Sequence, residues 1–290
     1  MSQSESSARG ILYPSRLPEF HRLQAPESLA HAVRWFWIPV WDLPHGVQSR
    51  QEILPFPACN LVVESAGGAS TGRVSFVGPP TRRSERVLEG QGWAVGALLR
   101  PAAAHALHAQ LPSVRDTEVI VNAPDLLAKV VAAMDRNASS GLEDAGDPLN
   151  RAGQRELAAA ALGAWIHNRV PAASARSATD KLANRMSELL LDASITRVDQ
   201  LADRLGTSAR TVQRIADQYF GLPPLSMIRR RRLQESAERL SADANLSLAD
   251  LAAELGYSDH AHFTNDFTAV LGLTPTQYRG IESSPRKGSP

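Results

Sequence analysis

The chain has 290 residues, of which 43% are hydrophobic and 21% are charged, with a formal net charge of +1. This length is enough for two domains that each bury a core. The longest apolar run, around residues 157–166, is too short to cross a bilayer, and the polar N-terminus lacks the apolar segment of a secretory signal. A single cysteine, Cys59, excludes an internal disulfide, so we expect a cytoplasmic protein. The small net charge neither requires nor excludes a nucleic-acid partner.

The first hundred residues have the composition of β-strands, and the rest has that of helices. Aromatic and β-branched stretches between Gly, Pro and Ser turns predict strands at 33–41, 50–54, 60–64, 73–77 and 93–99. Apolar residues three and four apart predict helices at 102–111, 123–134, 154–168 and 178–191. The order of elements therefore predicts an α+β fold: a β-rich domain, cupin-like or a short barrel, with a helical extension, then an all-α domain.

The predicted domain boundaries follow from these changes in composition and residue pattern. We expect disorder at 1–10 and 281–290, a front domain at 11–175, a connecting helix at 176–194 and a back domain at 195–280. The boundary between the domains is expected within 170–177 or 192–196, where small and polar residues gather.

The back domain repeats one pattern fifty residues apart. LADRLGTS (201–208) matches LAAELGYS (251–258), and GLPP (221–224) matches GLTP (272–275). In each copy the glycine is suited to end one helix in the left-handed conformation, and the serine is suited to cap the next. The small Ala202 and Ala252 suit a tight helix crossing. The pattern predicts two helix-turn-helix units, a first unit (201–224) and a second unit (251–275), each able to place its second helix in a DNA major groove.

The second helix of the first unit has two distinct faces. At about 100° per residue, the inner face consists of Val212, Ile215, Ala216 and Tyr219, and the outer face of Arg210, Gln213, Arg214 and Asp217. Arg and Gln are the side chains that pair bidentately with guanine and adenine edges. A solvated helix face carries such residues too, but within a duplicated helix-turn-helix we predict base contacts.

The corresponding helix of the second unit lacks a positive charge on its outer face. Its inner face holds Phe263, Phe267 and Val270, and Ala261, Asn265 and Thr268 point outward. Asn265 could pair with adenine, and His260 or His262 could contact a phosphate. A base-reading role and a solvent-facing role are equally open for this helix.

A basic segment, MIRRRRLQESAERL (227–240), connects the two units and has a helical apolar stripe. One helix here could hold the two recognition helices about one DNA turn apart. We expect phosphate contacts from Ser208, Ser258, Arg229 and Arg230, and ion pairs from the remaining arginines. Residues 195–280 contain ten basic and ten acidic residues, so DNA binding would depend on a local basic face.

These residues resemble the AraC/XylS family of transcription regulators. The likeness covers about 195–279 and rests on LADRLGTSARTVQR, RRRRLQESAERL, LAAELGYSDHAHFTNDF and GLTPTQYR. It implies seven helices with two helix-turn-helix units that bind adjacent major grooves near promoters. Further segments, WFWIPVWD, QEILPFPACNLVVE, GPPTRRSERVLEGQGWAVGALLRP and SITRVDQLA, resemble an actinobacterial-type subgroup with a β-rich front domain of undefined function.

The resemblance also implies site residues and partners. By position, base-reading residues fall on Arg210, Gln213 and Arg214, and on His260, Ala261, His262 and Asn265. The sequence departs from the family pattern at Ala216, at Asp217 and at the pair Asn265-Asp266. These departures affect the expected DNA contacts and not the expected fold. The implied partners are promoter DNA, a small-molecule effector, a second copy of the chain and, for an activator, RNA polymerase.

Other chemistry has weaker support in the sequence. His105 and His108 share a helical face without a carboxylate at ligand spacing, so we expect no metal, no cofactor and no enzyme. Cys59 has no basic neighbour in sequence to activate a thiol, although an enzyme or thiol sensor targeted by DNA binding stays an alternative. Trp35, Trp37 and Trp93 could line a ligand pocket, or they could be core residues. A purely dimerising front domain is the third alternative.

Overall fold

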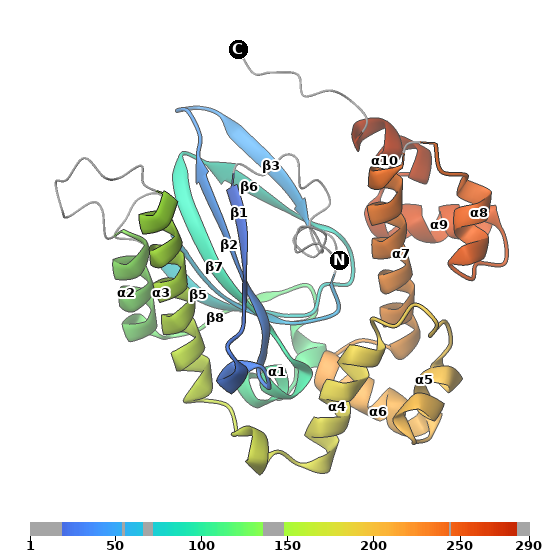
Figure 1. Cartoon of the computed structure of the whole chain (residues 1–290), viewed down its shortest axis with the longest axis horizontal. Coiled ribbons are helices and arrows are strands. Elements are labelled where there is room, and N and C mark those ends of the chain that lie inside the picture. Colours follow the sequence, from blue (N-terminus) through green and yellow to red (C-terminus); the bar gives the residue numbers. More distant parts are fainter. Residues whose placement is uncertain (1–18, 54–55, 66–71, 136–147, 244, 283–290) are drawn as a thin grey trace.

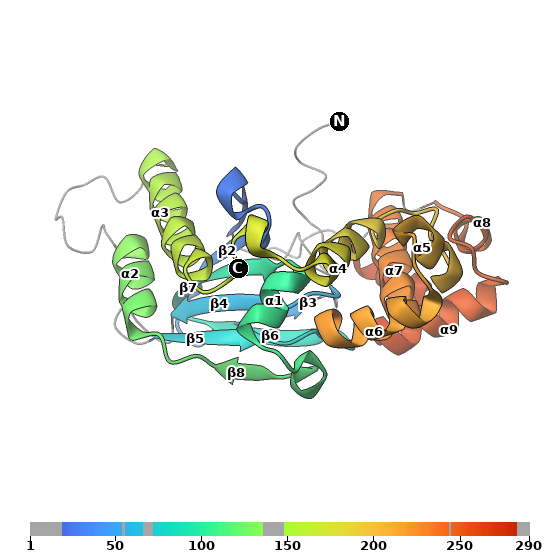
Figure 2. The same cartoon turned by 90° about the horizontal axis from the view of Figure 1, so that it is seen from below.

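The computed structural model describes residues 19–53, 56–65, 72–135, 148–243 and 245–282, arranged as a sheet-rich front domain beside a helical back domain (Figure 1). Of the ends expected to be disordered, 1–10 and 281–290, residues 1–10 and 283–290 lie outside the described residues, whereas residues 281 and 282 belong to a helix, Pro275–Glu282, which corrects the expectation there. No helix in the described ranges is long and apolar enough to cross a membrane. Figure 2 shows the back domain placed beside one end of the sheet rather than on either of its faces.

The front domain is built on one antiparallel six-stranded sheet and a two-stranded ribbon. The sheet order is β1-β2-β7-β4-β5-β8, and the ribbon pairs β3 with β6. The strands are β1 (Glu19–Gln24), β2 (Val33–Asp42), β3 (Gln48–Ile53), β4 (Asn60–Ser65), β5 (Gly72–Val77), β6 (Ser84–Glu89), β7 (Gln91–Leu99) and β8 (Glu118–Ile120). Among the described strands no pairing joins β1 to β8, so the sheet stays open instead of closing into the expected barrel.

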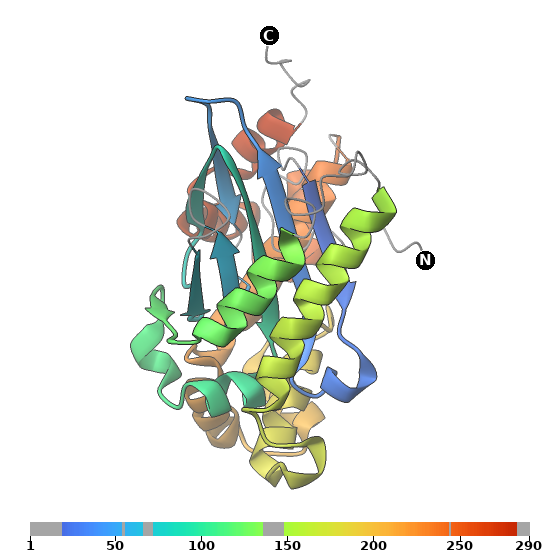
Figure 3. The same cartoon turned by 90° about the vertical axis from the view of Figure 1, so that its left-hand side faces the viewer.

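Two helices cover one face of the sheet and create the front-domain core (Figure 3). These are α2 (Pro124–Met134) and α3 (Pro148–His167). Alternation along the strands sends Phe36 and Ile38 of β2, and Val95 of β7, toward these helices, where each is at most 2% exposed. Gly163 of α3 lets the helix approach closely, because a side chain there would collide with Leu29.

The predicted strands of the front domain are confirmed, and three further strands are present. The predictions at 33–41, 60–64, 73–77 and 93–99 correspond to β2, β4, β5 and β7, and that at 50–54 to β3, with residue 54 outside the described range. Two of the additional strands were not predicted because their sequences are largely polar: β1 is EFHRLQ and β6 is SERVLE. Strand β8 has only three residues, too few for a visible alternation.

Short helices complete the front domain and lead into the back domain. They are η2 (Glu27–Leu29), α1 (Pro101–Leu107), η3 (Leu111–Val114) and η5 (Ala173–Ala175). Seven helices follow: α4 (Ala178–Leu189), α5 (Val198–Leu205), α6 (Ala209–Phe220), α7 (Pro224–Ala242), α8 (Leu248–Glu254), α9 (His260–Leu271) and α10 (Pro275–Glu282). The expected helix-rich back region is therefore confirmed.

The back domain has two separate cores, one for each helix-turn-helix unit. The first combines α4, α5, α6 and the start of α7, down to Met227 and Ile228. The second begins on the same helix with Leu233 and includes Phe263, Phe267 and Tyr278. Helix α7 thus belongs to both cores and connects the units, as its apolar stripe predicted. Helix α4 shares the first core through Ala183 and Met186, so the connecting helix packs with the back domain.

Candidate nucleic-acid interface

The first unit forms because a glycine and a serine set the angle between α5 and α6. Gly206 ends α5 with φ 65° and ψ 37°, the left-handed conformation that glycine adopts without steric cost. Ser208 then caps α6, its hydroxyl accepting a hydrogen bond from the Thr211 N–H at 3.2 Å. The tight crossing predicted for Ala202 is consistent with its burial at 4% exposure.

The inner and outer faces of α6 separate as the sequence predicted. Val212, Ile215, Ala216 and Tyr219 are all buried, whereas Arg210, Gln213, Arg214 and Asp217 are exposed. Within the described residues no hydrogen bond or ion pair engages Arg210, Gln213 or Arg214. The first half of α6 therefore presents two guanidinium groups and an amide whose donors are all available. In helix-turn-helix proteins generally, this N-terminal part of the second helix is the part that contacts base edges.

The second unit uses the same design with a shifted cap. Gly256 takes φ 76° at the turn, but the capping residue of α9 is Asp259, which accepts a hydrogen bond from the His262 N–H at 2.7 Å. The expected cap, Ser258, instead donates to Asp259. The extra residue in the second repeat accounts for this correction, since it moves the helix start by one position. Phe263 and Phe267 are fully buried beneath α9.

The outer face of α9 is exposed, yet its polar groups bind one another. His260, Ala261, His262 and Asn265 are all exposed. The imidazole of His262 lies 3.1 Å from the Ser258 hydroxyl and 3.8 Å from the Asp266 carboxylate. His260 lies 3.4 Å from the Thr264 hydroxyl. No hydrogen bond engages the amide of Asn265 in the described structure, so this side chain is the polar group on the outer face of α9 that stays available to a partner.

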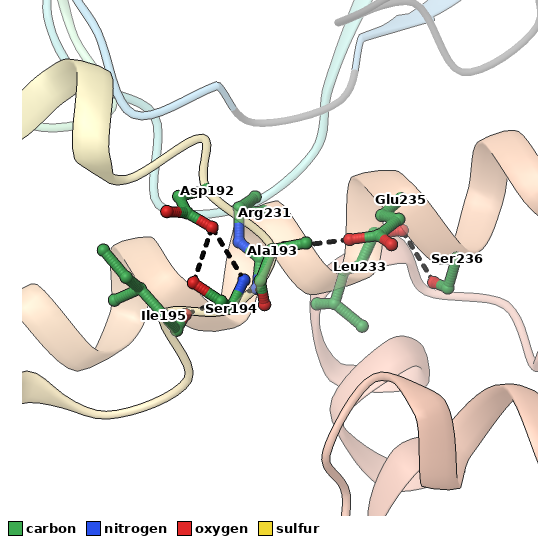
Figure 4. A network of polar contacts seen from close by, with 8 residues as sticks. All are labelled: Asp192, Ala193, Ser194, Ile195, Arg231, Leu233, Glu235 and Ser236. Atoms are coloured by element: carbon green, nitrogen blue, oxygen red, sulfur yellow. Dashed lines mark hydrogen bonds and ion pairs between the residues drawn. The ribbon is translucent and has the colours of Figure 1, made fainter. Parts of the chain in front are cut away.

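The four consecutive arginines of α7, at 229–232, have separate roles, and only one of these four is exposed. Arg229 is exposed and lies 3.7 Å from Asp266 of α9. Arg231 is buried, pairs with Glu235 at 2.8 Å and donates to the carbonyls of Ala193 and Ile195 at 3.3 and 3.4 Å (Figure 4). It thereby fastens the α4–α5 turn to α7. Arg232 lies 3.7 Å from the ring centre of Tyr257, a cation–π contact inside the second unit.

The expectation that Arg230 contacts phosphate needs correction. Its side chain is only 5% exposed, and its guanidinium donates to the carbonyls of Pro80 at 2.6 Å and Thr81 at 3.2 Å. Burial lowers its pKa to about 10, which leaves it charged at neutral pH. Arg230 is therefore a contact between the two domains and is not accessible to DNA in this arrangement.

The front domain touches the C-terminal end of each recognition helix. Arg115 donates to the carbonyl of Gly221, which ends α6, and lies 3.5 Å from Asp217. At the other unit, the Arg83 N–H donates to the Val270 carbonyl at 3.4 Å, and its guanidinium lies beside Gly272, which ends α9. Cations are favourable at helix C-termini. Sequence reasoning missed both arginines, because their partners lie far away along the chain.

The aromatic and sulfur groups singled out from the sequence do not assemble into one site. Trp93 belongs to the core beneath α2 and α3, whereas Trp37 pairs with Gly96 and covers it on the opposite face of the sheet. Trp35, an even number of residues away from Trp37, shares that opposite face. The expected pocket of Trp35, Trp37 and Trp93 is therefore incorrect, because strand alternation separates them.

The candidate reactive groups of the front domain are also dispersed. Cys59 is 2% exposed, and burial raises the pKa of its thiol. His105 lies against Tyr219, while His108 stacks on Phe76. Among the described residues, no group of three or more His, Cys, Asp or Glu side chains could hold a metal ion.

Comparison with known proteins matches two parts of the chain to different domain families. Residues 201–281 match a helix-turn-helix domain family, and residues 21–118 match a domain of unknown function, DUF6597. The first range contains both units described above. The second contains most of the front-domain strands.

The curated relatives align with the back part of the chain. The transcriptional activator AarP of Providencia stuartii is 29% identical over 119 residues, which cover 39% of this chain and 87% of AarP. The transcriptional activator RhaR of Escherichia coli K12 is 30% identical over 118 residues, which cover 37% of this chain but only 42% of RhaR. The chain thus spans less than half of RhaR.

Solved structures show a more distant likeness. ToxT of Vibrio cholerae has a TM-score of 0.43 at 9% identity, with 86% of this chain and 99% of ToxT covered. The C-terminal domain of AraT of Geobacillus stearothermophilus has a TM-score of 0.32 at 19% identity, covering 38% of this chain and 90% of that domain. The assignment therefore rests on the sequence comparisons together with the duplicated helix-turn-helix. Residues 201–281 therefore belong to a helix-turn-helix domain family, and the curated relatives that align with this part of the chain are named as transcriptional activators.

Proposed function

We propose that the chain binds promoter DNA in a sequence-specific manner with α6 as its main base-reading helix. One observation carries this proposal: Arg210, Gln213 and Arg214 form an exposed face whose donors are all available, on a helix whose other face is buried. The front-domain contacts on α6 lie at its C-terminal end, at Asp217 and Gly221, and leave this face open.

The second unit has a smaller part in the proposal. On α9 the acid Asp266 lies between Arg229 and His262, which offsets the positive charge that a phosphate would require. We propose that α9 enters the neighbouring groove, that Asn265 contributes its single base contact, and that Ser208, Ser258 and Arg229 contact phosphates. The second unit then mainly fixes the position of the first.

Regulation and partners complete the proposal. The relatives AarP and RhaR are named as activators, which supports an activating role with RNA polymerase as a partner. We propose a cytoplasmic regulator, without enzymatic activity, whose front domain responds to a small molecule or forms a homodimer. Burial of Cys59 disfavours the thiol-sensor alternative, since a protonated and inaccessible thiol is unreactive.

Selection of genomic DNA tests the proposal directly. Purified full-length protein is mixed with sheared genomic fragments, with and without a metabolite pool, and the bound fragments are sequenced. We expect enrichment of fragments that share two half-sites about 10 bp apart, because two recognition helices in adjacent grooves are one DNA turn apart. Enrichment without any shared motif would overturn sequence-specific binding. Enrichment that changes with the metabolite pool would identify effector control, whereas unchanged enrichment would favour a dimerising front domain.

A further inference from the structure

A buried guanidinium lacks a partner at the junction of the two domains. Arg176 is 7% exposed, although the residues on either side of it, from 171 to 178, are exposed. All three of its guanidinium nitrogens are buried and have no hydrogen-bond partner. Buried charges in proteins are normally paired, because removing them from water is costly. The position of Arg176 therefore points to a partner that is separate from the protein.

Arg176 lines a cleft of about 270 Å³ that opens to solvent. The cleft is of a size suited to a small molecule. Its walls come from α1 of the front domain, from the segment that leads into α4, and from α6 of the first unit. The lining residues are Ala102, His105, Ala106, Pro171, Arg176, Asp180 and Tyr219.

The acid in the cleft, Asp180, acts on Arg176 through its charge, but its hydrogen bonds go to other groups. Asp180 accepts hydrogen bonds from the N–H and the hydroxyl of Ser177, at 3.0 and 2.8 Å, in the capping box of α4. Its carboxylate also interacts with the Tyr219 hydroxyl. In the described part of the chain no ion pair joins Asp180 to Arg176. The charge of Arg100, which faces Arg176, is already balanced by Glu188 at 2.8 Å.

A second donor site is present in the same cleft. The Nδ1 atom of His105 is buried and has no hydrogen-bond partner, while its Nε2 atom lies 3.3 Å from Gln218 of α6. An imidazole nitrogen can donate a hydrogen bond to an oxyanion. The alanine and proline walls add an apolar surface. Together these groups match a ligand that has an anionic end and an apolar body.

We propose that this cleft binds a small organic anion, whose carboxylate or phosphate group pairs with Arg176 and whose apolar part lies against Ala102, Ala106 and Pro171. A guanidinium binds either group through two parallel N–H···O bonds.

The location of the cleft gives the ligand a route to the DNA-binding face. Tyr219 belongs to the same helix as Arg210 and Arg214, whereas Ala102 and His105 belong to the front domain. An anion held between them stabilises whichever domain arrangement closes the cleft, since a ligand shifts an equilibrium by its differential affinity for the two states. This regulatory step rests on the proposed function; the binding step does not.

Calorimetry on the full chain tests the binding step. The probes are benzoate and phenyl phosphate, with uncharged benzamide for comparison. The variant is Arg176→Met, and the matched control is Arg185→Met, which removes an exposed arginine from the adjoining helix α4. We expect at least one of the two anions to bind the parent and the control, with benzamide weaker. Loss of the bidentate contact should weaken binding to Arg176→Met by about tenfold or more.

The relative affinities of the two anions show which charged group the cleft prefers, and three other results would contradict the proposed site. Tighter binding of phenyl phosphate indicates a phosphorylated ligand, and tighter binding of benzoate indicates a carboxylic acid. No binding of either anion in the millimolar range, equal binding of benzamide, or equal binding to Arg176→Met would each overturn the site. If Arg176→Met fails to fold, Arg176→Lys, which keeps the charge without the planar fork, is measured in its place with the same expectation of weaker binding.

Thermal unfolding and DNA binding provide two further readouts. In buffer without the probes, we expect Arg176→Met to melt at a higher temperature than the parent, because it removes an unpaired buried charge. Added anion should then raise the melting temperature of the parent but not of the variant. If an anion binds and leaves DNA affinity unchanged, the regulatory step is overturned and the site stands. If DNA binding is absent while the anion still binds, the proposed function fails and the site is unaffected.

Discussion

In the first helix-turn-helix unit, the outer face of α6 keeps two arginines and a glutamine without partners, whereas in the second unit the polar groups of α9 bind one another. The scaffolds are nearly the same: each unit has a left-handed glycine in the turn and a second one at the end of its recognition helix. The contrast therefore lies on the surface. The two units share their turns and helix ends and differ in the polar groups of their outer faces.

The ends of the two recognition helices show a likeness that the outer faces do not. Arg115 contacts the end of α6 at Gly221, and Arg83 contacts the end of α9 at Gly272. Each contact comes from the front domain, and each leaves the N-terminal half of the helix open. The front domain thus contacts both helices at their C-terminal ends, opposite the N-terminal ends with which recognition helices generally contact bases. A change in its arrangement would alter the two units together.

The largest expected effect is a loss of stability when a buried side chain is removed from either core of the two units. Phe267→Ala removes a fully buried ring from the second core and should lower the free energy of unfolding by about 3–5 kcal/mol, and Ile215→Ala in the first core by about 2–5 kcal/mol. Urea unfolding of the full chain measures both. Gln213→Ala, at an exposed position, serves as the control and should stay within about 0.5 kcal/mol of the parent. A parent-like Phe267→Ala would show that the second core contributes no stability.

Much of this comparison could be predicted from the sequence, because it depends on local rules. Strand β2 follows from its aromatic and β-branched residues, and the two faces of α6 follow from the 3.6-residue period. Gly206 and Ser208 took their predicted roles because a turn and a cap are decided within a few residues. The exposure of Arg210, Gln213 and Arg214 follows from the same period, whereas their contact with bases stays a prediction.

The rest depends on contacts between distant segments. Nothing around Arg230 distinguishes it from Arg229, yet one is buried against Pro80 and Thr81 while the other is exposed. Arg83 and Arg115 lie in loops of the front domain, where only the tertiary structure brings them to helix ends. Arg176 stands in a small-residue segment that reads as a linker, and only the packing of three elements around it reveals its burial.

The second prediction separates the neighbouring arginines of α7. Arg230→Met leaves two carbonyls without their donor, so the free energy of unfolding should fall by about 1–3 kcal/mol while the salt dependence of DNA binding stays unchanged. Arg229→Met, its matched control, should keep the stability of the parent and reduce the salt slope by about 0.9 through the loss of one phosphate contact. If Arg230→Met instead reduced the salt slope and Arg229→Met left it unchanged, Arg230 and not Arg229 would reach DNA. The two domains would then have to separate on binding.

The third prediction addresses the face of α6. Arg210→Ala or Arg214→Ala should each weaken binding to the selected DNA by about 1–3 kcal/mol, because each removes a bidentate donor to a base. Fluorescence anisotropy with labelled DNA measures the change. Arg185→Ala removes an exposed arginine outside the unit and is expected to bind like the parent. If both α6 variants also bind like the parent, this face does not contact DNA.

The smallest expected effect decides what the second unit does. Asn265→Ala should weaken binding by less than about 1 kcal/mol, since a single amide reads at most one base and its neighbours are engaged with Ser258 and Asp266. Asn265→Arg supplies the positive charge that α9 lacks, and if α9 lies in a groove the salt slope should steepen by about 0.9. An unchanged slope would place α9 outside the groove. If Asn265→Ala instead weakened DNA binding as much as Arg214→Ala does, the two units would contribute equally to base recognition despite their different surfaces.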